Sequence, residues 1–145
     1  MAQPQMRRAI ESGVPDNQQY LHPLLKKNYG DWKYHDRPRP GVLHHVAHNG
    51  DQVWTVRAGT QRQMDVYTIR RLCDIADRFA EGHVRFTIRS NIEFMLSSEA
   101  KVAPLIAELE KSGFPVGGTG NSVSMIAHTQ GWLHCDIPGT DASGA

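Results

Sequence analysis

The chain has 145 residues, close to the length of one ordinary domain, and 39% of them are apolar. This apolar share excludes a disordered chain, and the net charge of +1 excludes a polybasic arm that binds nucleic acid. The two cysteines cannot form a disulfide scaffold, and no apolar run is long enough to span a membrane. We therefore expect a soluble, cytoplasmic protein. Among its 16 basic residues arginine outnumbers lysine by eleven to five, which favours binding of carboxylates and other oxyanions.

Residues 1–40 form a polar stretch without sustained periodicity, and we expect an N-terminal arm there. Part of this stretch is nevertheless rich in apolar and aromatic side chains: Leu21, Leu24, Leu25, Tyr29, Trp32 and Tyr34. Burial of such side chains is favourable. The arm is therefore expected to pack on its own domain or on a partner, and the sequence leaves both alternatives open.

A β-hairpin is predicted after the arm, because segments 41–48 and 52–58 flank Asn49-Gly50, a dipeptide typical of tight turns. The hairpin contains three histidines that could bind a metal: His44, His45 and His48. Neighbouring residues of a strand face opposite sides of the sheet, and no carboxylate or cysteine of the pattern completes a metal site. We therefore expect structural roles for these histidines.

Apolar residues at helical spacing predict two helices. The first helix covers 65–80, with Asp65 as its N-cap and Cys73 on its buried face. The second helix covers about 99–111 and is followed by Gly113, a typical C-cap residue. We expect both helices to turn their apolar residues inward.

Between the two helices, alternation predicts a strand over 83–89 with two sets of side chains on opposite faces. These sets are Val84, Phe86 and Ile88 toward the core, and Arg85, Thr87 and Arg89 on the other side. Segment 92–96 continues as a strand, so residues 89–91 are expected to form a tight bend.

From residue 52 the predicted order is strand, helix, strand, strand, helix. An extended segment after Pro115 would complete the split βαβ unit of a ferredoxin-like α+β fold. We assign residues 41–116 to this half-domain and 117–145 to the beginning of a second domain. The last residues (DIPGTDASGA) are rich in turn formers and contain no closing element, so we expect a truncated chain.

Arginines are predicted to gather on the polar face of the sheet: Arg57, Arg62, Arg85 and Arg89. Guanidiniums on one face repel each other unless they meet an anion, so we expect an anionic ligand; solvated arginines on an open face are the alternative. The glycine loop 117–120 could bring backbone N–H groups to the carboxylates of a ligand, but it lacks the ending of a P-loop. An ordinary turn is the alternative there.

Several motifs resemble those of dissimilatory sulfite reductase beta subunits, within the siroheme sulfite and nitrite reductase superfamily. The motifs are NYGDWKYH, GVLHHVAHNGDQVWTVRAG, HVRFTIRSNIEFM, FPVGGTGNSVS and HTQGWLHCDIPGTDASG, and together they span about residues 20–145. The resemblance implies two cofactors, siroheme and a 4Fe–4S cluster that shares a thiolate with it. Siroheme is a polycarboxylate and sulfite is a small oxyanion, which would explain the arginine excess.

The resemblance also implies roles for individual residues, with Arg89 as the catalytic arginine that reaches the substrate anion. The residues expected to contact siroheme are Arg57, Arg62, Arg85, Thr87, Arg89, Thr119, Asn121, His128, Gln130 and Trp132. Cys135 matches the first cluster cysteine, but this sequence lacks the later C-C-x-x-x-C element that supplies the other three. We therefore expect the chain alone to complete neither cofactor site. Assimilatory relatives have a second arginine that binds the substrate near this position, where this sequence has Asn121-Ser122. A second residue that binds the substrate anion is therefore expected from elsewhere, such as the alpha subunit.

The implied activity is the six-electron interconversion of sulfite and sulfide-level sulfur, in the reductive or the reverse direction. The implied partners are an alpha subunit, in an alpha2beta2 assembly that would bury the aromatic residues of the arm, and a small sulfur-carrier protein. An assimilatory sulfite or nitrite reductase is the nearest alternative. Another is a ferredoxin-like module that binds RNA or a small ligand, which should expose aromatics where Arg85, Thr87 and Arg89 are expected.

Overall fold

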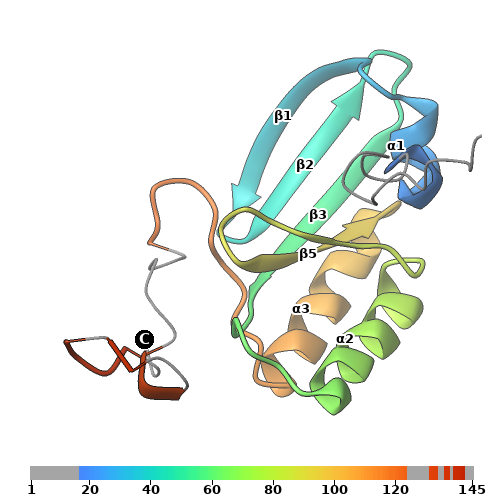
Figure 1. Ribbon diagram of the computed structural model, residues 1–145. Helices are drawn as coiled ribbons and strands as arrows, with labels where there is room; N and C mark the ends of the chain where they lie inside the picture. The colour runs from blue at the N-terminus through green and yellow to red at the C-terminus, as the bar shows by residue number, and fades with distance from the viewer. Residues whose placement is uncertain (1–16, 124–130, 134–135, 138, 143–145) are drawn as a thin grey trace, which may run out of the picture.

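A computed structural model describes residues 17–123, 131–133, 136–137 and 139–142, which contain a five-stranded antiparallel sheet with two helices on one face (Figure 1). The strands are β1 (Trp32–Arg39), β2 (Val42–Ala47), β3 (Gln52–Gly59), β4 (Val84–Phe86) and β5 (Asn91–Leu96). The α-helices are α1 (Pro23–Lys27), α2 (Val66–Phe79) and α3 (Val102–Lys111). Short 3-10 helices are η2 (Asn17–Tyr20), η3 (Glu99–Lys101) and η4 (Gly131–Leu133).

The strand order β1-β2-β3-β5-β4 places β5 between β3 and β4. The β3–α2–β4 unit is therefore split by β5, which confirms the predicted ferredoxin-like α+β fold. After α3 the chain returns to the sheet, where Val116 forms a single antiparallel bridge to Ala58 of β3. The hairpin of β1 and β2 extends the sheet on this same side of β3.

Local signals in the sequence correctly place the hairpin and both long helices. In the β2–β3 turn, Gly50 has a φ of +90°, a conformation that favours glycine, and the Asn49 side chain accepts a bond from the Asp51 N–H (2.9 Å). Asp65 is the N-cap of α2, and its carboxylate accepts the Thr68 N–H at 2.7 Å. Gly113, with a φ of +83°, follows the end of α3.

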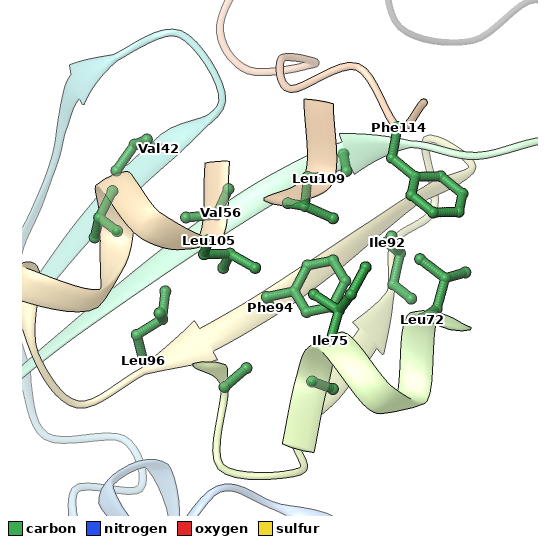
Figure 2. Close-up of a cluster of buried hydrophobic side chains, with 14 residues drawn as sticks. Val42, Val56, Leu72, Ile75, Ile92, Phe94, Leu96, Leu105, Leu109 and Phe114 are labelled. Atoms are coloured by element: carbon green, nitrogen blue, oxygen red, sulfur yellow. The ribbon is translucent and has the colours of Figure 1, made fainter. Parts of the chain in front are cut away.

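The hydrophobic core lies between the two helices and the sheet (Figure 2). Alternate residues of β3 and β5 point to the helices, and Phe94 of β5, which is 0% exposed, lies among side chains from both helices. The buried cluster consists of Val42, Val56, Ala58, Leu72, Ile75, Ala76, Ala80, Ile92, Phe94, Leu96, Val102, Leu105, Leu109 and Phe114. The opposite face of the sheet carries no long helix among the described residues and is called the open face below.

Replacing Asp65 with alanine is expected to lower the free energy of unfolding by about 1 kcal/mol, because the bond to the Thr68 N–H is lost at the start of α2. Urea unfolding of the two proteins measures this difference. Asp65→Asn should retain most of the stability, because an asparagine side chain also caps helices well. Equal losses for alanine and asparagine would contradict the capping role.

The prediction that Cys73 lies in the core is wrong, because its side chain is exposed. The buried stripe of α2 consists of Leu72, Ile75 and Ala76. Each residue of a helix is rotated by about 100° from the one before, so Cys73 lies to the side of this stripe. Helix α3 packs beside α2, and the exposed Arg71 donates to the Ser112 carbonyl at the end of α3 (3.2 Å).

The predicted strand over 83–89 is too long, because β4 ends at Phe86. The chain then turns, with Ser90 donating to the Thr87 carbonyl (3.1 Å) and holding a φ of +55°. Phe86 and Ile88 were expected in the core, but they are 68% and 94% exposed. Alternation alone could not show that β4 is an edge strand, which the helices cover only in part.

Residues 32–39, expected in the arm, form the edge strand β1. The sequence WKYHDRPR is mostly polar and contains Pro38, so its pattern does not predict a strand. Tyr34 pairs with Val46 of β2 and remains 46% exposed, and Tyr29 is 63% exposed. Packing of these aromatics on a partner therefore remains a prediction.

The segment before β1 is attached to its own domain at two places. His22 is 2% exposed, and its Nε2 lies 2.6 Å from a carboxylate oxygen of Glu81, just after α2. At the other end, the Asn28 side chain donates to Asp51 (2.9 Å) and accepts from Asn49 (2.8 Å). The described part of the arm before β1 therefore packs on its own domain, through polar residues that hydrophobic patterning could not identify.

Candidate anion-binding site

Three charged residues form a row across the open face. Arg57 of β3, Glu93 of β5 and Arg85 of β4 lie directly opposite one another in the registers of the sheet. Their neighbours Val56 and Phe94 point to the core, so the row points the other way. The predicted convergence of Arg57 and Arg85 on one sheet surface is thus confirmed, and we call the three residues the Arg57–Glu93–Arg85 row.

The carboxylate of Glu93 bonds both arginines. Its Oε2 accepts from Nε of Arg57, and its Oε1 lies 2.7 Å from Nη2 of Arg85. Glu93 is 2% exposed, whereas the side chains of Arg57 and Arg85 are 19% and 55% exposed. The two guanidiniums and the one carboxylate together carry a net charge of +1. The guanidiniums also compensate the free-energy cost of burying the carboxylate, which would be high if it were unpaired.

Both guanidiniums retain donors for a ligand. A guanidinium carries five N–H donors, and each recorded bond to Glu93 uses one nitrogen of Arg57 or Arg85. The half-exposed Arg85 can therefore bind a second anion while it remains paired. Glu93, an anion of the chain itself, relieves part of the repulsion from which we expected an external anion.

Asn91 supplies an unsatisfied donor on the same face. It precedes Glu93 by two residues in β5, is 3% exposed, and its Nδ2 has no hydrogen-bond partner within the described segments. An unpaired buried amide destabilises a protein by about 1–3 kcal/mol. Such a group commonly marks a place that a ligand or water satisfies.

His45 of β2 lies on the same face of the sheet, opposite Val53 of β3. Burial, the adjacent His35 and the charges of Arg85, His44 and Arg57 lower the pKa of His45 to about 4. The two imidazoles lie with Nδ1 atoms 2.6 Å apart, and Nε2 of His45 lies 3.4 Å from the Thr55 hydroxyl. His45 is therefore neutral near pH 7 and adds no charge to the face.

Acidification is expected to destabilise the chain through His45. An unfolded histidine takes up a proton near pH 6.5, whereas folded His45 does so only near pH 4, so the folded state loses stability as the pH falls through this window. Urea unfolding at several pH values from 7 to 4 should show a shallower decline for His45→Gln than for the unchanged chain. Identical slopes would contradict this pKa.

Arg89, in the turn after β4, bonds the glycine loop and the residues that follow it, whereas Arg57 and Arg85 bond Glu93. Its Nη2 donates to the Ser122 carbonyl (2.5 Å) and its Nη1 to the Gly120 carbonyl (3.4 Å). In the same loop, the Thr119 hydroxyl accepts from the Gly41 N–H at 2.9 Å. The predicted siroheme contacts Arg89 and Thr119 are therefore brought together, but in a cluster separate from the Glu93 contacts.

The other predicted site residues are dispersed. Thr87 is half-buried, and its hydroxyl accepts from the Asn91 N–H (3.2 Å), so it supports the β4–β5 turn. Arg62, between β3 and α2, and Asn121, just after the glycine loop, are both exposed. Trp132 is 66% exposed. His128, Gln130 and Cys135 lie outside the described residues.

Glu93 and Asn91 are the two site residues that sequence reasoning missed. One signal for Glu93 was present in the sequence, because a single carboxylate interrupts the apolar segment IEFML. In the sheet this residue lies on the strand between the two arginines, one strand spacing from each. Within the described residues, no three histidine, cysteine or carboxylate side chains are arranged to hold a metal, and no helix is long and apolar enough to cross a membrane.

Residues 45–112 match the family model described as the nitrite/sulfite reductase ferredoxin-like half domain. The chain is similar to proteins named dissimilatory-type sulfite reductase subunit beta from three organisms. It is 49% identical to that of Archaeoglobus fulgidus, 47% to that of Nitratidesulfovibrio vulgaris and 46% to that of Megalodesulfovibrio gigas. These alignments cover 91%, 97% and 99% of this chain, but only 38%, 39% and 57% of the respective relatives.

Proposed function

The chain belongs to the family of dissimilatory-type sulfite reductase beta subunits, and from this premise we propose that it helps to bind siroheme in such an enzyme. The proposed activity is the six-electron interconversion of sulfite and sulfide-level sulfur. The chain spans about two-fifths of the length of two of its relatives. We therefore propose this activity for the whole enzyme and not for the chain alone.

The observation that carries the proposal is the Arg57–Glu93–Arg85 row with Asn91 beside it. Siroheme is a polycarboxylate, and forked guanidiniums bind carboxylates through paired, charge-assisted hydrogen bonds. The buried Nδ2 of Asn91 is a donor without an acceptor in the described part of the chain, as expected of a face built for an oxygen-rich ligand. The residues present therefore fit the carboxylates of siroheme.

When bound, siroheme and a 4Fe–4S cluster would supply the electron chemistry. The chain's own residues would orient the macrocycle through Arg57 and Arg85, while Arg89 would neutralise the oxygens of sulfite. The other proposed siroheme contacts are Arg62, Thr87, Arg89, Thr119, Asn121, His128, Gln130 and Trp132. Cys135 is the proposed cluster ligand, and a cluster needs three further cysteines that this sequence does not contain.

The proposal includes partners and a location. The name "subunit beta" of the relatives indicates an enzyme with more than one kind of subunit. We propose an alpha subunit in an alpha2beta2 assembly, a small sulfur-carrier protein, and a cytoplasmic location. The exposed Tyr29 and Tyr34 support a protein contact at the arm, because exposed aromatics are enriched in interfaces.

The test is the visible absorption spectrum of the longest reading frame that contains this chain, produced together with an alpha subunit. Siroheme absorbance is expected, and Arg57→Ala and Arg85→Ala should each lower the siroheme content per protein. Arg78→Ala is the matched control, because Arg78 pairs with Glu108 between the helices, away from the open face. A protein without siroheme absorbance would overturn the proposal.

A further inference from the structure

Glu93 occupies the position where one small anion would otherwise bridge two arginines. Each of its carboxylate oxygens serves a different guanidinium, Oε2 that of Arg57 and Oε1 that of Arg85. Neighbouring strands are about 4.8 Å apart, so the backbones of Arg57 and Arg85, on either side of β5, are about 10 Å apart. Negative charge therefore lies midway between two positive charges.

We propose that Glu93 is a positioning residue that makes the row select a ligand with two separated carboxylates over a single small oxyanion. This inference rests on the proposed function and specifies how the open face would distinguish siroheme from sulfite. It assigns the row to the cofactor and leaves the substrate anion to a different group.

Repulsion accounts for one half of this selectivity. An oxyanion placed between Arg57 and Arg85 would face the Glu93 carboxylate at short distance, and like charges repel strongly where burial limits screening by water. A ligand with carboxylates farther apart avoids that contact, because each carboxylate meets the outer donors of one arginine.

Preorganisation accounts for the other half. A free arginine side chain loses considerable rotamer freedom when it binds a ligand. The bonds to Glu93 already restrict both guanidiniums, so less freedom remains to be lost when a polycarboxylate binds. Glu93 thus favours one class of anion and disfavours the other.

The test uses the siroheme-free enzyme, assembled with its alpha subunit, and two probes: uroporphyrin, a porphyrin polycarboxylate, and inorganic sulfate. Glu93→Gln keeps the shape of the side chain but removes its charge. It should weaken uroporphyrin binding by about tenfold, as expected for loss of a charge-assisted arrangement, and strengthen sulfate binding. Porphyrin fluorescence measures the first affinity, and displacement of radiolabelled sulfate measures the second.

Two further variants separate positioning from stability. Glu108→Gln removes the carboxylate of another arginine pair, with Arg78, and should leave both affinities unchanged. Glu93→Asp keeps the charge but is one methylene shorter, so it cannot reach both arginines; it should weaken uroporphyrin binding without improving sulfate binding. If Glu93→Gln does not fold, Glu93→Asp tests the inference in its place.

The decisive quantity is the ratio of the two affinities. A merely structural Glu93 would lower both affinities in parallel, and an unchanged ratio in the Glu93 variants would overturn the inference. If Arg57→Ala and Arg85→Ala lose uroporphyrin while the Glu93 variants keep the wild-type ratio, the proposed function stands and only the role of Glu93 fails. If the unchanged enzyme does not bind uroporphyrin, both fail.

Discussion

Replacing Arg89 with alanine is expected to reduce transition-state stabilisation in the assembled sulfite reductase by about 2–4 kcal/mol, the usual effect of removing one donor to a developing oxyanion. The structure adds a second reason, because the Arg89 guanidinium also bonds the carbonyls of Gly120 and Ser122. Without it, the glycine loop loses two of its contacts. Arg89→Lys keeps the charge but not the planar fork, so we expect a smaller loss of turnover.

Sulfite turnover and siroheme absorbance, measured on the same preparations, test this prediction. Siroheme should persist in both Arg89 variants, because Arg57 and Arg85 of the row would still bind its carboxylates. Arg78→Ala, which removes an arginine on the helical side, is the control for a general loss of charge. Unchanged turnover with normal siroheme would remove Arg89 from the catalytic role and leave it as a support for the loop.

Replacing Phe94 with alanine is expected to lower the free energy of unfolding by about 3–5 kcal/mol. Phe94 is 0% exposed and lies between the side chains of α2 and α3, so alanine would leave a cavity that the surrounding elements cannot fill (Figure 2). Chemical unfolding, followed by far-UV circular dichroism, measures the loss.

Ile88→Ala is the matched control for Phe94→Ala. Ile88 is 94% exposed in the turn after β4, so removal of its side chain leaves no cavity. We expect a change within about 0.5 kcal/mol, as for most surface substitutions. A loss comparable to that of Phe94→Ala would show that Ile88 is buried in the protein in solution.

Those parts of the fold that depend on neighbouring residues could be predicted from the sequence. Asn49-Gly50 determines the hairpin turn, and Asp65 determines the start of α2, through bonds that span only two or three residues. The errors concern burial, which depends on distant elements. Cys73 has helical spacing but lies beside the buried stripe, and Phe86 alternates correctly on a strand that proves to be an edge.

The candidate site shows the same division. Arg57 and Arg85 could be placed on one surface, because the predicted strand order and the alternation of side chains are sufficient for that inference. The role of Glu93 depends on the registers of two strand pairs, which no local signal specifies. Arg89 was expected at the end of a strand beside Arg85, but an early turn moves it to the glycine loop.

The edge position of β4 has a consequence for how the chain behaves in solution. An edge strand presents unpaired N–H and C=O groups that can template pairing with another chain, especially where apolar residues such as Phe86 are exposed beside them. The central residue of this three-residue strand is Arg85, and a charge at such a position discourages edge-to-edge aggregation. The same guanidinium that is proposed to bind the cofactor would thus also keep the protein soluble by preventing self-association at this edge. Neutral substitutions of Arg85 should therefore be studied at low protein concentration, where loss of ligand binding and self-association can be distinguished.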